Sequence, residues 1–235
     1  MQKSTNLPLR ISYLLLLFLI SCTTNKVVKG YQPTNLEKTS FEVPYFSNPD
    51  IDYVYKANIT VYGKELTGIF IAKKINETTH RVAFTTEFGN KLLDFEISET
   101  DFKVNSIVDE LNKKILINTL KSDFRLLLRS HYVTKAQFEN QQNKIYLSKQ
   151  GKMLNYLFVF KSDNSLNKII HASKRKEKIT LFFASENNIF ASRIVIKHKG
   201  IPLKIELNYF KEDGAKEQST EAPVNEEPTN EEPTN

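Results

Sequence analysis

The chain has 235 residues, of which 40% are hydrophobic and 26% are charged. This length favours one domain with appendages over two full domains, and the composition excludes a disordered chain and a membrane protein with several spans. A single cysteine excludes an internal disulfide framework and a zinc site built from several cysteines. Only seven glycines are present, which argues against a glycine-rich phosphate-binding loop.

The net charge of +6 is unevenly distributed along the chain. Residues 211–235 contain eight acidic and two basic residues and repeat the motif Asn-Glu-Glu-Pro-Thr, so we expect a disordered acidic tail there. The rest of the chain is strongly basic, as in proteins that contact nucleic acid, anionic membranes or acidic partners. Its lysines are scattered and form no stripe with stacking aromatic residues, so we expect no nucleic-acid binding.

The first residues have the features of an export signal. Lys3 and Arg10 lead into an apolar run at residues 11–20, which is too short to cross a hydrocarbon core about 30 Å thick. The run ends in Leu19-Ile20-Ser21-Cys22, which resembles the lipobox of bacterial lipoproteins. The resemblance implies a signal peptide over residues 1–21 and a lipid on Cys22. The alternative is an ordinary signal peptide that ends by chance beside the only cysteine.

A lipid on Cys22 would anchor the protein in the bacterial cell envelope. Residues 22–40 are mostly polar and are expected to be a tether between the lipid and a folded domain at residues 41–210. No acidic residue follows Cys22 directly, which favours the outer membrane and its periplasmic side. We expect a monomer whose contact with the membrane is made through this N-terminal lipid.

The folded domain shows two runs of strand-like sequence around one helix-like segment. Apolar residues recur at three- and four-residue steps from Leu111 to Leu128, which predicts an amphipathic helix of about twenty residues with Asp109 and Glu110 at its start. Before it and after it, short alternating segments separated by turn residues predict eleven strands. These segments are residues 53–61, 66–73, 80–86, 92–97, 102–108, 144–148, 154–161, 168–173, 178–185, 191–197 and 203–210.

The predicted fold class is α+β. Eleven antiparallel strands are enough for an open sheet to curl, and the amphipathic helix must bury its apolar stripe on one face of that sheet. We therefore expect a strongly curved antiparallel sheet, an incomplete barrel of about 11 strands, with the helix covering its concave face. Residues 135–142 are expected to be a polar connection between the helix and the second run of strands.

No sequence motif indicates an enzyme. The four histidines (His80, His131, His171 and His198) are far apart in the sequence, and none has a second metal ligand at a typical spacing. No nucleophile elbow, zinc-protease motif or phosphate loop occurs. Asp109 and Glu110 are adjacent on the predicted helix start, where capping explains them better than paired catalysis. We expect no enzymatic activity, no metal and no cofactor.

The order of these segments resembles the lipoprotein localisation factors of the LolA/LolB-like superfamily. The local similarity lies in residues 81–97, where a strand, a turn ending in Gly89 and a second strand follow one another, and in the hairpin at residues 59–70. It extends over residues 53–210. The resemblance implies an incomplete antiparallel barrel whose mouth is covered by helices, and a ligand with long acyl chains.

If the resemblance extends to function, the concave face holds acyl chains of a lipoprotein or another amphiphile. The alternative from the residues themselves is a filled core in a structural or interaction lipoprotein, because any core needs apolar residues on one face of each strand. The candidate lining residues are Ile59, Val61, Phe70, Phe84, Phe95, Ile97, Leu120 and Phe124.

Overall fold

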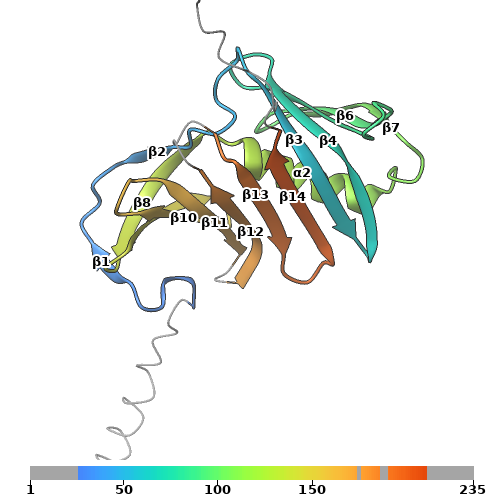
Figure 1. Cartoon of the computed structure of the whole chain (residues 1–235). Helices are drawn as coiled ribbons and strands as arrows, with labels where there is room; N and C mark the ends of the chain where they lie inside the picture. Colours follow the sequence, from blue (N-terminus) through green and yellow to red (C-terminus); the bar gives the residue numbers. More distant parts are fainter. Residues whose placement is uncertain (1–25, 174–175, 186–189, 211–235) are drawn as a thin grey trace, which may run out of the picture.

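The structure is a computed structural model that describes residues 26–173, 176–185 and 190–210. It contains one strongly curved antiparallel sheet that does not close into a barrel (Figure 1). The expected open, curved sheet is therefore confirmed, whereas the expected number of strands was wrong: the sheet has 14. The strand order is β1-β8-β9-β10-β11-β12-β13-β14-β3-β4-β5-β6-β7, and β2 pairs beside it with β8.

All eleven expected strands are present. Strand β14 pairs with β3 along seven residues, and this joins the two runs of strands into one sheet. The first run is β3 (Asp52–Val61), β4 (Lys64–Lys74), β5 (His80–Thr85), β6 (Lys91–Ile97) and β7 (Phe102–Ile107). The second run is β9 (Asn143–Gln150), β10 (Met153–Phe160), β11 (Leu166–Ser173), β12 (Lys176–Ala184), β13 (Arg193–His198) and β14 (Leu203–Tyr209).

The three additional strands all belong to one corner of the sheet. Strand β8 (His131–Glu139) pairs with both β1 (Gln32–Thr34) and β2 (Ser40–Glu42). Most of the expected connection at residues 135–142 is therefore strand, because its backbone pairs on both sides. Residues 26–40, within the expected tether, contain a short 3₁₀-helix η1 (Lys26–Val28) as well as β1.

The helix α2 (Lys114–Leu128) has 15 residues and begins later than expected. Asp109 and Glu110 do not cap it, because backbone hydrogen bonds from Leu111 to Val108 and from Asn112 to Asp109 fold the preceding residues into a turn. The N-cap is Lys113, which makes no side-chain hydrogen bond to the helix. In the described part of the chain, α2 is the only α-helix, and no helix there is long and apolar enough to span a membrane.

The main core lies between α2 and one face of the sheet. Phe124 on α2 contacts Phe70 on β4 and Phe95 on β6, and the helix lies within the curve of the sheet (Figure 1). Alternating side chains from β3 to β14 complete this core. The periodic apolar residues of the sequence therefore have the partner that their pattern requires.

A second, smaller core covers the opposite face of β9, β10 and β11. It contains five buried residues, and Val27, Val28 and Tyr31 from the N-terminal segment pack against it. The buried members are Ile145, Tyr156, Phe158, Ile170 and Ala172. Strand β10 is consequently buried on both faces, which explains why it is apolar at almost every position.

Candidate functional site

Six of the eight candidate cavity residues lie on strands β3 to β6, and the other two, Leu120 and Phe124, belong to α2. Seven of the eight belong to the main core and are at most 3% exposed, and Val61 packs against that core. The ring centroid of Phe124 lies 5.4 Å from that of Phe70 and 6.4 Å from that of Phe95. These side chains therefore pack against one another. The predicted lipidation site, Cys22, lies outside the described residues.

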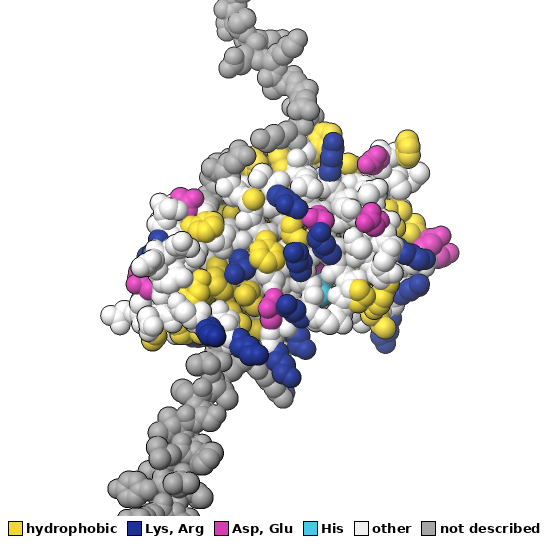
Figure 2. All heavy atoms as spheres, turned by 60° about the horizontal axis from the view of Figure 1, so that its bottom comes forward, with side chains coloured by type: hydrophobic (Ala, Val, Ile, Leu, Met, Phe, Trp, Pro, Cys, Tyr) yellow, Lys and Arg dark blue, Asp and Glu magenta, His cyan; other side chains and the backbone are white. Residues whose placement is uncertain are grey.

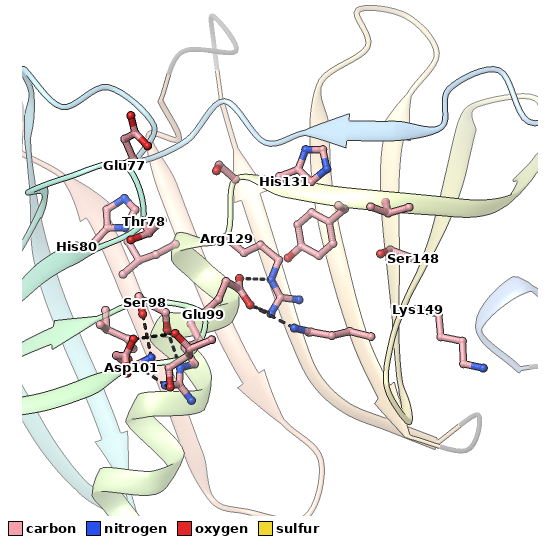
Figure 3. A pocket seen from close by; sticks show the side chains of 18 residues that line it. Glu77, Thr78, His80, Ser98, Glu99, Asp101, Arg129, His131, Ser148 and Lys149 are labelled. Carbon is pink, nitrogen blue, oxygen red and sulfur yellow. Dashed lines mark hydrogen bonds and ion pairs between the residues drawn. The ribbon is translucent and has the colours of Figure 1, made fainter.

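A separate cleft of about 530 Å³ opens where α2 ends and β8 begins. Its walls come from the loop before β5, the β6–β7 turn, the last turn of α2, the start of β8 and the end of β9 (Figure 3). Of the eight candidates, Ile97 reaches this cleft. Most of the other lining side chains are polar or charged, as expected for a site that faces water.

The two arginines of the cleft are bound to protein groups. Arg125 donates hydrogen bonds to the carbonyl oxygens of Ser98, Thr100 and Asp101 at 2.8–3.0 Å. Arg129 forms a two-bond ion pair with Glu99, whose carboxylate also accepts a hydrogen bond from Gln150 (Figure 3). These bonds hold the β6–β7 turn against the end of the helix. The two arginine side chains therefore stabilise the walls of the cleft.

The histidines also have structural partners. The Nε2 atom of His80 lies 2.8 Å from the carbonyl oxygen of Phe46, and burial lowers the pKa of His80, which favours the neutral ring. The Nδ1 atom of His171 lies 2.6 Å from Oδ1 of Asn155. Within the described ranges, no group of three or more His, Cys, Asp or Glu side chains is placed to hold a metal ion.

The face of the sheet opposite α2 has a different character. Four residues stand in one row across four neighbouring strands: Phe158 on β10, Lys168 on β11, Phe182 on β12 and Val195 on β13. Phe160 lies two residues beyond Phe158, and Lys197 lies two residues beyond Val195, on this same face. We call these six residues the aromatic–lysine face.

Both lysines of this face lie over aromatic rings. The Nζ atom of Lys168 is 3.9 Å from the ring centroid of Phe158, and that of Lys197 is 5.5 Å from the ring of Phe182. Burial lowers the pKa of Lys168. Within the described ranges, neither lysine forms an ion pair. The negative charge of Glu177 on β12 acts on Lys168 in the direction that raises its pKa, but without an ion pair both ammonium groups can still meet an anion from outside the chain.

Two of the three aromatic rings of this face are open to solvent, whereas Phe158 is buried in the second core. Phe160 is 41% exposed and Phe182 is 39% exposed. Figure 2, which brings the lower side of Figure 1 forward, shows hydrophobic side chains exposed among lysines and arginines. An apolar surface with unpaired cations on it is suited to a molecule that has both an apolar part and a negative charge.

Sequence reasoning missed the aromatic–lysine face because it assigned only one apolar face to the sheet. The signal lay in residues 153–160, where seven of eight side chains are apolar. A strand that is apolar on both faces must be covered, or must bind something, on both.

No family model and no curated protein matches the chain. Among solved structures, a LolA superfamily protein from Nitrosomonas europaea is similar at 12% identity and a TM-score of 0.48, over 72% of this chain and 88% of that one. A DUF1329 family protein from Desulfovibrio piger is similar at 11% identity and a TM-score of 0.38, over 80% and 88% of the two chains.

A domain from Vibrio parahaemolyticus that is assigned to outer membrane lipoprotein sorting is similar at 9% identity and a TM-score of 0.42, over 71% of this chain and 87% of that one. The resemblance to LolA-superfamily proteins that the sequence indicated is thus found again among solved structures.

Proposed function

We propose that this chain is a lipid-anchored protein of the bacterial cell envelope that binds an amphiphilic molecule without chemical change. The ligand has an apolar chain and an anionic group, and it binds on the aromatic–lysine face. One observation carries the proposal: the row Phe158–Lys168–Phe182–Val195 places one cationic side chain among three apolar ones across four hydrogen-bonded strands.

The geometry supports an anionic ligand in particular. Lys168 is half-buried, and burial already disfavours its charged form, so an incoming carboxylate or phosphate would regain charge stabilisation there. Phe160 on β10 and Phe182 on β12 offer exposed apolar surface on the two strands that flank β11, the strand of Lys168. Burying that surface stabilises a complex by about 25 cal/mol per Å².

Anchoring through Cys22 would place this binding face in the envelope, where amphiphiles are abundant. The proposed location is the outer membrane, on its periplasmic side. Replacing Cys22 by alanine should abolish incorporation of radioactive palmitate and release the protein from membranes. A Cys22→Ala variant that still incorporates label and still sediments with the outer membrane would contradict the anchoring.

The binding proposal is tested by titrating the full chain with a fluorescent fatty acid below its critical micelle concentration. Phe182→Ser should weaken binding several-fold, whereas Phe88→Ser should not. Phe88 is a matched control because it is 94% exposed on the turn between β5 and β6. Lys168→Gln should weaken binding of the anionic probe and leave binding of an uncharged analogue unchanged. Equal effects of the two phenylalanine variants would contradict the proposed site.

A second function is favoured by the packing under α2. Because seven of the eight candidate cavity residues are buried and Phe124 packs against Phe70 and Phe95, the helix-covered side fits a closed structural or interaction protein. Failure of the full chain to bind any amphiphile, with normal stability, would support this second function.

A further inference from the structure

The N-terminal segment approaches the domain on the aromatic–lysine face. Val27 and Val28 of η1 pack against the second core, and the ring of Tyr31 meets the ring of Phe158 edge-on at 5.9 Å. Phe158 is the first residue of the cross-strand row. The described chain therefore begins beside the same face that carries the unpaired lysines.

This placement limits how far the face can lie from the lipid anchor. Four peptide steps separate Lys26 from Cys22, and a fully extended chain covers at most about 3.3–3.6 Å per residue. Lys26 is thus within about 14 Å of the lipidated residue, whatever path the chain takes. Because the folded domain begins so close to the bilayer, the surface around η1 has to face the bilayer.

The charges of that surface match an anionic membrane. Lys26 and Lys29 are exposed at η1, and Lys168 and Lys197 lie on the adjoining face. Each lysine near an anionic leaflet gains attraction that falls off within a Debye length. Exposed phenylalanines beside lysines also suit the boundary between head groups and acyl chains.

We infer that the aromatic–lysine face, together with Lys26 and Lys29, docks on the surface of the anionic bilayer that holds the lipid of Cys22. The inference rests on the anchoring part of the proposed function. It adds an orientation: the ligand-binding face is turned toward the membrane and the cleft at the end of α2 is not part of the contact.

The test is lysine footprinting of the lipidated full-length protein. The protein is reconstituted into vesicles of phosphatidylethanolamine and phosphatidylglycerol, and into neutral phosphatidylcholine vesicles for comparison. Acetylation rates of Lys26, Lys29, Lys168 and Lys197 are then measured by mass spectrometry. We expect all four to react at least three-fold more slowly on the anionic vesicles, and the protection to shrink in high salt.

Lys73 and Lys103 serve as internal controls, because they are half or more exposed and lie on β4 and β7. Their rates should be the same on both kinds of vesicle. In the Lys26→Gln/Lys29→Gln variant, protection of Lys168 and Lys197 should decrease, while a Lys73→Gln/Lys103→Gln variant should behave like the unchanged protein.

Equal protection of the two sets of lysines would overturn the docking inference, even where soluble fatty acid still binds. Loss of fatty-acid binding with intact footprints would instead contradict the ligand site and leave the orientation standing. A protein whose intact mass shows no lipid on Cys22 would overturn both the anchoring and the orientation.

Discussion

Asp123 on α2 and His198 on β13 meet inside the main core. The Oδ2 atom of Asp123 lies 2.9 Å from Nε2 of His198, and the two side chains are 0% and 4% exposed. Burial raises the pKa of Asp123, and the hydrogen bond from His198 acts in the opposite direction. Within the described structure, Oδ1 of Asp123 has no hydrogen-bond partner. The imidazole of His198 is therefore the main compensation for burying this carboxyl group.

Removing the hydrogen bond from His198 to Asp123 should destabilise the folded protein. We expect His198→Leu to lower the free energy of unfolding by about 3–5 kcal/mol, because it leaves a buried carboxyl group without its partner. The double variant Asp123→Leu/His198→Leu should lose much less than the sum of the single variants. Denaturant unfolding of the four proteins measures the coupling. Additive losses would show that the two side chains act independently.

Phe124→Ala should also destabilise the protein strongly. Its ring is 0% exposed and contacts two other rings, so truncation leaves a large void and should cost about 3–5 kcal/mol. Ile115→Ala is the matched control on the same helix, since Ile115 is 70% exposed and its truncation should change stability by about 0.5 kcal/mol or less. A loss of only about 1–2 kcal/mol for Phe124→Ala would instead indicate loose packing beneath a movable helix.

Gly68 on β4 is fixed by the neighbouring strand. A Cβ atom at this position would lie 1.9 Å from the carbonyl oxygen of Thr85 and 3.0 Å from the ring of Phe84. Gly68→Ala should therefore force β4 and β5 apart and cost about 3 kcal/mol or more. Gly63→Ala, at a turn with open space around it but a φ of +78°, should cost about 1 kcal/mol. Thermal unfolding of both variants gives the comparison, and a reversed order would contradict the close approach.

Acid should weaken the fold through His171. Burial lowers the pKa of His171 from 6.5 to about 4, so between these values the unfolded chain binds a proton that the folded chain does not. Stability should then fall as the pH drops from 6.5 to 4, by about 2 kcal/mol once the partial exposure of the ring is allowed for.

The variant His171→Gln tests this, because it removes the proton site and keeps a donor for Asn155. Its stability should change less between pH 6.5 and 4 than that of the unchanged protein. A part of the slope should remain, since burial also lowers the pKa of His80 and acts with the same sign. An identical slope in both proteins would exclude His171 as a source of acid sensitivity.

Periodicity in the sequence was sufficient to identify eleven strands and the helix, because each of these elements buries an alternating or helical set of apolar residues. It was not sufficient for β1 and β2, which have three residues each and become strands only by pairing with β8. Strand β8 itself buries Thr134 and Gln137 where an apolar pattern would be expected. Its strand conformation depends on partners about one hundred residues away.

The candidate site, like the fold, could be predicted from the sequence only in part. The sequence placed eight residues, Phe124 among them, on the apolar faces of their strands or helix, and seven of the eight are buried in the main core. It could not tell whether the space between them is filled, since that depends on how closely the helix approaches the sheet. The row from Phe158 to Val195 could not be predicted, for another reason. The register of strand pairing decides which residues of neighbouring strands lie opposite one another, and the periodicity within one strand does not determine that register.

Because the sheet stays open, its described strands end at two edges, at which another extended polypeptide could add a strand. At one edge, β1 is only three residues long and contains Pro33, which has no backbone N–H to donate. At the other, β7 runs for six residues, mostly exposed, with Val104 38% exposed and Lys103 beside it. Self-association or capture of an unfolded segment should therefore begin at β7, and Lys103 is the residue whose charge opposes it.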